Sequence, residues 1–151
     1  WLGFYVIATD DRAELCSAEN MPHADERYVV SPGEVAERVP VHSRTYIAAV
    51  TRGVPLDVAM LPALLATPAP YIGVLGSRRR WATAAQQLRE QGIDEHTLAR
   101  VHAPIGLELE AETPREIAVS IMAEILAHRT GASAEPMKWM SEPEEAGPAP
   151  D

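Results

Sequence analysis

Residues 71–80, Tyr71-Ile72-Gly73-Val74-Leu75-Gly76-Ser77-Arg78-Arg79-Arg80, place an apolar run, a glycine and the start of a helix in direct succession. The first five residues are typical of a strand that is buried on both faces. From Arg78 to Gln91 the apolar positions recur at helical spacing, and Gly92 ends the helix. A strand, a glycine and a helix in this order are typical of a parallel α/β sheet.

The same alternation of strands and helices extends to both sides of this unit. Thr113 and Glu116 form a capping box around Pro114, so a helix is expected from 114 to 129, with Gly131 behind it. We predict an α/β fold, a Rossmann-like parallel sheet with helices on both faces. The further strands are expected at 4–9, 28–30 and 45–50, and the last one at 101–103 or near Ile105. The further helices are expected at 57–66 and shortly after Ser31-Pro32-Gly33.

The first strand of such a fold is expected to be absent from this chain. That strand lies at the centre of a Rossmann sheet and carries a Gly-x-Gly-x-x-Gly turn, and the sequence contains no such turn. If residues 4–9 are the second strand, Leu2-Gly3 ends the helix that precedes it. We therefore predict that residues 1–131 form an N-terminally incomplete domain, with a central gap that upstream residues of the same protein would fill. Residues 132–151, rich in proline and glutamate, are expected to form a disordered tail.

The composition limits the classes of function. The net charge of −9 argues against nucleic acid and against an anionic membrane surface as the main partner. No apolar run approaches the roughly 20 residues that span a bilayer. Cys16 is the single cysteine, so no internal disulfide can form, and no stretch resembles a signal peptide. These features predict a cytoplasmic protein.

Two strand ends carry candidate binding residues. Asp10 follows the first expected strand, where a dinucleotide-binding domain has the acid that bonds ribose hydroxyls, although a solvated strand end has the same composition. Gly76 and Ser77 precede a helix whose exposed N–H groups favour an anion, and Arg78, Arg79 and Arg80 add positive charge. The alternative is a serine cap on a helix with solvated arginines.

The sequence indicates residues for catalysis or metal binding only weakly. His102 lies at an expected strand end, where a structural role is the more common one. Glu108, Glu110 and Glu112 alternate and could hold a hard cation, but they equally fit an exposed acidic loop. No set of zinc ligands is present, and no catalytic residue can be named from the sequence.

Several longer stretches together carry a family resemblance. They are Val6-Ile7-Ala8-Thr9-Asp10-Asp11-Arg12, Met21-Pro22-His23-Ala24-Asp25, residues 71–78, and His102-Ala103-Pro104-Ile105-Gly106-Leu107 running into residues 112–125. From about Phe4 to Gly131 the chain resembles the XdhC/CoxI family of molybdenum-hydroxylase maturation factors.

The resemblance implies a Rossmann domain at the carboxyl end of a longer protein. Such a protein would assist a xanthine or carbon monoxide dehydrogenase by handling the molybdenum cofactor (molybdopterin) before insertion. It would dock on a subunit of that enzyme and could itself form a homodimer. The implied cofactor-binding residues are Asp10, Gly76, Ser77, Arg78, Arg79, Arg100, His102 and Gly106. Arg100 and His102 would face the same crevice as Ser77, and Asp10 would meet a ribose-like hydroxyl.

The chain departs from the family pattern at two positions. Thr51 and Asp57 fit the pattern after the middle strand, but Arg52 stands where the family has a histidine, and Glu110 stands where it tends to have a glycine. Two other functions stay open. One is an NAD(P)-dependent oxidoreductase, favoured by Asp10, and the other is a degenerate Rossmann module that serves in docking or dimerisation.

Overall fold

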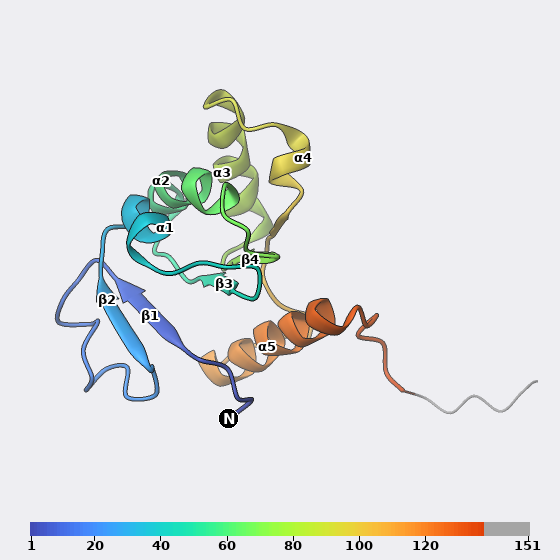
Figure 1. The fold of residues 1–151 in the computed structure, drawn as a ribbon. Helices are drawn as coiled ribbons and strands as arrows, with labels where there is room; N and C mark the ends of the chain where they lie inside the picture. Colours follow the sequence, from blue (N-terminus) through green and yellow to red (C-terminus); the bar gives the residue numbers. More distant parts are fainter. Residues whose placement is uncertain (138–151) are drawn as a thin grey trace, which may run out of the picture.

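The fold alternates strands and helices along the chain (Figure 1). The computed structural model describes residues 1–137, so most of the expected tail, 132–151, lies outside the described residues. The strands are β1 (Ile7–Asp10), β2 (Glu26–Val29), β3 (Tyr46–Ala49), β4 (Tyr71–Val74) and β5 (Val101–His102). The helices are the 3₁₀ turn η1 (Pro32–Glu34), α1 (Val35–Arg38), α2 (Val54–Leu65), α3 (Arg78–Glu90), α4 (Glu95–Leu98) and α5 (Pro114–Thr130).

All five strands pair in parallel, in two separate sheets. β1 pairs with β2, and the second sheet has the order β3-β4-β5. The registers place Ile7 opposite Glu26 and Gly73 opposite both Ala48 and His102. Within the described residues no backbone hydrogen bond joins β1 to β3. The predicted α/β class with parallel strands is confirmed.

One face of the three-stranded sheet is covered by α2 and α3. Ile72 and Val74 of β4 are buried against Leu61 and Leu64 of α2 and Leu88 of α3. Alternate strand residues point to opposite faces, so two of the four β4 side chains enter this core. Burial of these large aliphatic side chains stabilises the fold by about 1.5–3 kcal/mol each.

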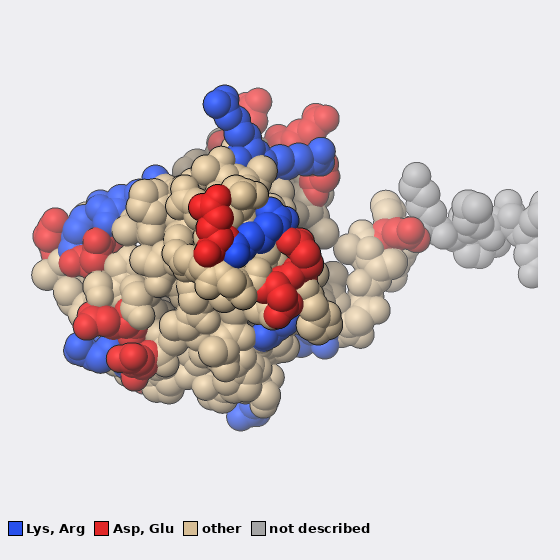
Figure 2. All heavy atoms as spheres, turned by 90° about the horizontal axis from the view of Figure 1, so that it is seen from above, with Lys and Arg blue, Asp and Glu red and all other residues tan. Residues whose placement is uncertain are grey.

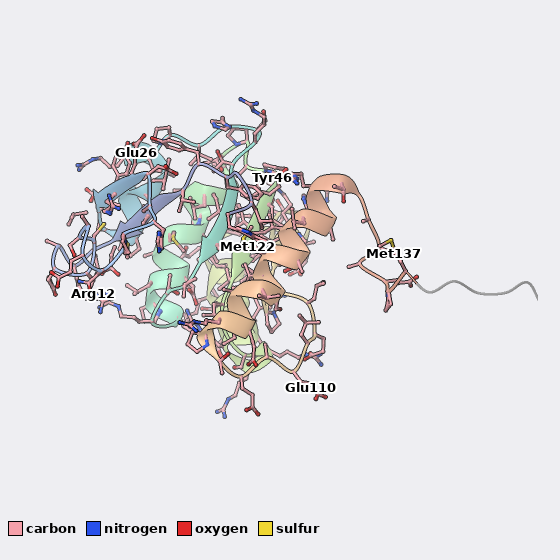
Figure 3. All side chains as sticks on the ribbon, turned by 90° about the horizontal axis from the view of Figure 1, so that it is seen from below. Arg12, Glu26, Tyr46, Glu110, Met122 and Met137 are labelled. Carbon is pink, nitrogen blue, oxygen red and sulfur yellow. The ribbon has the colours of Figure 1, made fainter. Side chains whose placement is uncertain are left out.

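The other face of the same sheet packs against α5. Tyr71 of β4 is buried with Ile121 and Ile125 of α5 and with Ile105. Tyr46 of β3 lies beside this cluster, and α5 lies on the side of β3 and β4 that is opposite to α2 (Figures 1 and 3). Helices therefore cover both faces of β3-β4-β5, as predicted.

The helix boundaries mostly follow their local signals. The Thr113–Glu116 capping box is present at the start of α5, and Gly131 ends that helix. α2 begins at Val54, three residues before the expected start, because Pro55 is well suited to a first helical turn. The short helix α4 was not predicted. In the described part of the chain, no helix is both long and apolar enough to cross a membrane. Figure 2 shows Lys and Arg side chains interspersed with Asp and Glu side chains on the face that is seen from above.

Candidate functional site

A cavity of about 470 Å³ lies between the segments that follow β1 and β3. Ligands of open parallel sheets bind in the crevice outside the carboxyl ends of the strands, which is where this cavity opens. Its charged and polar lining comes from Asp10, Asp11 and Arg12 after β1, and from Thr51 and Arg52 after β3. The predicted residue Asp10 is therefore at the crevice, and Arg52 is a lining residue that was not predicted.

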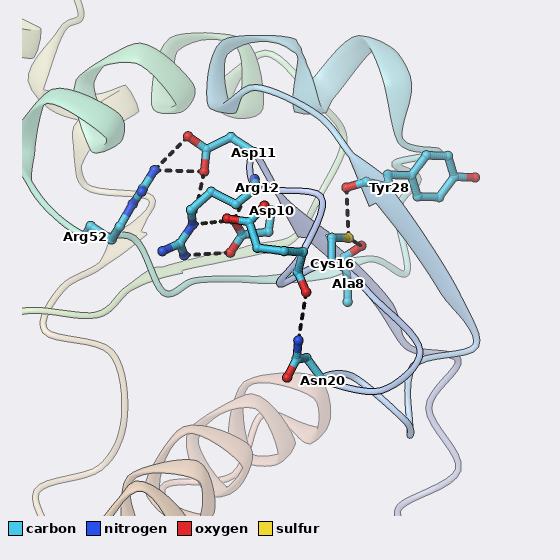
Figure 4. Close-up of polar contacts among 9 residues, drawn as sticks. Ala8, Asp10, Asp11, Arg12, Cys16, Asn20, Tyr28 and Arg52 are labelled. Atoms are coloured by element: carbon cyan, nitrogen blue, oxygen red, sulfur yellow. Dashed lines mark hydrogen bonds and ion pairs between the residues drawn. The ribbon is translucent and has the colours of Figure 1, made fainter.

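Asp10 is held by Arg12, two residues further on. The Arg12 side chain donates from Nε to Oδ1 of Asp10 at 2.9 Å and from Nη2 to Oδ2 at 3.0 Å, and its backbone N–H donates to Oδ1 at 2.9 Å (Figure 4). The side-chain hydrogen bonds from Arg12 lower the pKa of the Asp10 carboxyl from an ordinary 3.8 to about 2. A ribose hydroxyl at this position would therefore meet a carboxylate that already has a cationic partner.

This pair gives a first prediction. Replacing Arg12 by glutamine is expected to return the pKa of Asp10 from about 2 toward its ordinary 3.8, because the ionised form loses its main donors. The measurement is an NMR titration of the Asp10 carboxyl carbon in both proteins. The variant Arg27→Gln serves as the control, because the Arg27 guanidinium donates to backbone carbonyls and not to Asp10. An unchanged Asp10 pKa in the Arg12 variant would contradict the observed pairing.

A second ion pair joins the two sides of the crevice. The Arg52 guanidinium donates from Nη2 to both carboxylate oxygens of Asp11, at 2.8 Å to Oδ1 and 2.7 Å to Oδ2. Figure 4 shows this contact between the segment after β1 and the segment after β3. Arg52 stands where the family resemblance implies a histidine, and the imidazole of a histidine is shorter than the arginine side chain that makes this contact. Arg52 thus adds a positive charge to the lining of the crevice and joins its two sides.

Gly76 and Ser77 lie between β4 and α3, at the same edge of the sheet. The Ser77 side chain caps α3 by accepting a hydrogen bond from the backbone N–H of Arg80 at 3.1 Å. The N–H groups of Arg78 and Arg79 belong to the first helical turn and have no acceptor within the helix. The side chains of Ser77, Arg78 and Arg79 are exposed. The sequence offered two alternatives here, a Ser77 cap and an anion site at the start of α3. The structure has the cap, and it leaves the N–H groups of the first two helical residues open to an anion.

Arg80 differs from its two neighbours because it is engaged in a buried ion pair. Its guanidinium donates from Nε to Oδ2 of Asp57 at 2.9 Å and from Nη2 to Oδ1 at 2.8 Å. Asp57 is fully buried. Arg80 also bonds the carbonyl and the hydroxyl of Thr51, and that hydroxyl bonds Asp57. This cluster ties the end of β3 to the start of α3. Arg80 is consequently a structural residue, whereas the side chains of Arg78 and Arg79 stay exposed beside it.

Arg100 does not lie where the resemblance implied. Its guanidinium donates to the carbonyl of Leu65 at 2.6 Å and to that of Ala69 at 3.2 Å. These carbonyls belong to the end of α2 and to the segment that leads into β4, at the amino end of the strands. Because Ser77 follows the carboxyl end of β4, Arg100 is at the opposite edge of the sheet. The expectation that it faces the same crevice is wrong.

His102 and Gly106 belong to a hydrogen-bonded cluster under α5. The Glu124 carboxylate contacts Nδ1 of His102 at 2.8 Å and accepts from the Tyr71 hydroxyl at 2.7 Å and the Gly106 N–H at 2.5 Å. The His102 ring lies 4.5 Å from the Tyr71 ring, between the sheet and α5. Neither His102 nor Gly106 lines the crevice cavity. Gly76, Ser77, Arg78 and Arg79 do not line it either, so a contact of His102 with a ligand beside Ser77 stays a prediction.

The backbone conformation and the packing at position 106 both require a glycine. Its backbone has φ +102°, a conformation that favours glycine, and a Cβ at this position would collide with the Ser120 hydroxyl. That hydroxyl is not free to move, since it donates to the carbonyl of Leu107 at 2.6 Å. The glycine thus allows close packing of this turn on α5, and its proposed contact with a cofactor has no support in this geometry.

The three alternating glutamates are exposed and lie in the segment before α5, and Figure 3 shows Glu110 pointing away from the domain. In the part of the chain that the structure describes, no three His, Cys, Asp or Glu side chains come together as metal ligands do. Glu110 has φ +51°, the left-handed region in which glycine is favoured. The glycine that the family resemblance implies at this position would fit this backbone conformation without any contact to a ligand.

This conformation gives a second prediction. Replacing Glu110 by glycine is expected to stabilise the protein by up to about 1 kcal/mol, because a residue with a side chain is strained in the left-handed region. Urea unfolding of both proteins measures the difference. The control is Glu108→Gly, which is expected to be neutral or destabilising because residue 108 has no positive φ. A loss of stability in the Glu110 variant would contradict this reading of the loop.

The parallel sheet, the helices on both faces of β3-β4-β5 and the crevice at the strand ends define a domain of the Rossmann class. The XdhC Rossmann domain family matches residues 1–125, so the chain belongs to that family. The resemblance inferred from the sequence is confirmed.

Three relatives show how the chain compares with longer proteins. It is 34% identical to the uncharacterized protein YqeB of Escherichia coli (strain K12) over 94% of this chain and 26% of that protein. It is 30% identical to a probable xanthine dehydrogenase subunit of Bacillus subtilis (strain 168), over 84% of this chain and 36% of that protein. A crystal structure of a xanthine dehydrogenase from Bacillus halodurans has a TM-score of 0.72 and 28% identity, covering 90% of this chain and 39% of that one. The chain thus spans between a quarter and two fifths of these relatives.

Proposed function

We propose that this domain belongs to an accessory protein for the maturation of a molybdenum hydroxylase of the xanthine or carbon monoxide dehydrogenase type. In that role it binds the molybdenum cofactor or a nucleotide at the carboxyl edge of its sheet and docks on a subunit of the target enzyme in the cytoplasm. Family membership and two relatives named as xanthine dehydrogenase proteins support this function.

The observation that carries the binding proposal is the start of α3. Two exposed arginines stand beside backbone N–H groups that have no acceptor in the helix, and Ser77 already caps the N–H of the third helical residue. The molybdenum cofactor and a nucleotide both carry phosphate, and the start of a helix is a favourable site for a phosphate group. The Arg78 and Arg79 side chains would attract the phosphate by their positive charge, and the backbone N–H groups would orient it through hydrogen bonds. The two charged strand ends, with Asp10 and Arg52, would contact the rest of the ligand.

Calorimetric titration tests this proposal. The molybdenum cofactor and NAD(H) are titrated into the natural full-length polypeptide and into its double variant Arg78→Gln, Arg79→Gln. We expect at least about tenfold weaker binding of the cofactor in the variant, since charge-assisted bonds to an anion contribute about 1.5–3 kcal/mol each. The matched control is Arg38→Gln, an exposed arginine at the end of α1. Equal affinities in all three proteins would overturn the assignment of this site.

A nicotinamide-dependent oxidoreductase is the second candidate, and Asp10 at the end of β1 favours it. Tight binding of NAD(H) with no binding of the molybdenum cofactor would replace the first proposal by this one. If neither ligand binds while the polypeptide is a dimer in sedimentation equilibrium, a docking or dimerisation module is the function that remains.

A further inference from the structure

The guanidinium of Arg52 is only partly used by its ion pair with Asp11. Both contacts to the Asp11 carboxylate come from Nη2, at 2.8 Å to Oδ1 and 2.7 Å to Oδ2 (Figure 4). In the described part of the chain, Nε and Nη1 of Arg52 have no hydrogen-bond partner. Arg80, by contrast, uses all three of its side-chain nitrogens on Asp57 and Thr51. Arg52 therefore has donors left for another acceptor.

The backbone of Arg52 is anchored, whereas its side chain is open to solvent. Arg52 lines the crevice cavity, and 48% of its side chain is exposed. The preceding residue, Thr51, is tied to the start of α3, because the Arg80 guanidinium donates to the Thr51 carbonyl at 3.1 Å and also bonds its hydroxyl. Arg52 thus carries its charge at a fixed place in the crevice.

We propose that Asp11 and Arg52 form a latch across the crevice, in which Asp11 occupies Arg52 only until an oxyanion of the ligand, a phosphate group, takes its place. The latch rests on the proposed function, since it requires a phosphate-bearing ligand in this crevice. A phosphate can accept from two guanidinium nitrogens at once, in the two-pronged geometry that arginine favours, whereas Asp11 meets Nη2 alone. Exposed ion pairs of this kind are also weak, so an anion can displace the carboxylate.

The displaced carboxylate has a second cation within reach. Nε of Arg12 lies 3.7 Å from Oδ1 of Asp11, and 34% of the Asp11 side chain is exposed to solvent. The Arg12 contacts to Asp10 come from Nε and Nη2, so Nη1 of Arg12 is still free of that pair. Release of Asp11 from Arg52 therefore leaves no buried charge without a partner, and the exchange is inexpensive.

An NMR titration of the natural full-length polypeptide with sodium sulfate tests the latch. Sulfate is a tetrahedral oxyanion like phosphate, and it keeps one charge state near neutral pH. The reporters are the Arg52 Nε–H signal and the backbone amide of Gly53, and sodium chloride keeps the ionic strength constant. We expect Asp11→Asn to bind sulfate about threefold more tightly, because the competing carboxylate is gone. Arg52→Gln is expected to bind it at least about tenfold more weakly, because the charged donors are lost.

The opposite directions of these two effects separate a latch from a structural bridge. Both variants remove the same ion pair, so a pair that only joins the two sides of the crevice would shift both affinities in the same direction. The control is Glu14→Gln, which removes an exposed carboxylate of the same loop and is expected to leave the sulfate affinity unchanged. Weaker binding in Asp11→Asn would overturn the latch, and so would an equal gain in Glu14→Gln.

The latch and the proposed function fail in different experiments, because sulfate contains neither a pterin nor a nucleoside. Arg52 and Gly53 signals that do not move with sulfate would overturn the latch, while the calorimetric dependence of cofactor binding on Arg78 and Arg79 would be untouched. Sulfate affinities that follow the expected order, without any binding of the molybdenum cofactor or NAD(H), would support the anion site at Arg52 and remove the proposed ligands.

Discussion

Replacing Asp57 by asparagine is expected to lower the free energy of unfolding by about 3–5 kcal/mol, the range found when one partner of a buried ion pair is removed. Asp57 is fully buried, and both of its oxygens accept from the Arg80 guanidinium. The variant keeps the shape of the side chain but leaves the guanidinium charge without its counter-ion. Because the pair joins α2 to the start of α3, its loss should weaken the packing of both helices on β3-β4-β5.

Urea unfolding, followed by circular dichroism, measures this effect. The matched control is Asp11→Asn, which removes one carboxylate from the exposed pair with Arg52 and should cost less than about 1 kcal/mol. The double variant Asp57→Asn, Arg80→Met is expected to lose less than the sum of the two single losses, because the unpaired charge is gone. Equal losses in the Asp57 and Asp11 variants would contradict a structural role for the buried pair.

The second large effect is expected at Glu124. Replacing it by alanine should cost about 3 kcal/mol, because the buried Tyr71 hydroxyl and the Gly106 N–H both lose their acceptor. The variant Glu124→Gln is the matched control. Its amide oxygen can still accept from both of these donors, and its NH₂ group can face Nδ1 of His102, so its cost should be clearly smaller. Similar losses in both variants would indicate that the negative charge, and not the acceptor, stabilises the cluster.

The same residue gives the stability a defined pH dependence. Burial by itself raises the pKa of Glu124, but the hydrogen bonds from Tyr71, Gly106 and His102 outweigh it, and the pKa lies below its ordinary 4.5. A depressed pKa stabilises the folded state above the unfolded value, and this contribution disappears as the pH falls through the folded value. The advantage of the natural protein over Glu124→Gln should therefore be constant near neutral pH and shrink below about pH 4.5. An advantage that persisted at the lowest pH would contradict the shift.

Local patterns were sufficient for most of the elements, although not for α4, and for the family. The apolar run before Gly76 predicted β4, and the capping box at Thr113 predicted the start of α5, because both depend on residues within a few positions of each other. The Ser77 cap of α3 is also a local contact, because the two residues that form it are three positions apart. The family resemblance also came from linear motifs, and the match over residues 1–125 confirms it.

The roles of the charged residues required the folded chain. Arg78, Arg79 and Arg80 are equivalent in the sequence, yet Arg80 alone meets the buried Asp57, which is 23 positions away. His102 meets Glu124 across 22 positions, and Arg100 meets Leu65 across 35. No local pattern indicates such pairs, since they form only where packing brings β-strand ends and helices together. The sequence alone therefore established a parallel α/β domain of known family, while the tertiary contacts determined which of its charged side chains pair inside the fold and which stay exposed at the start of α3.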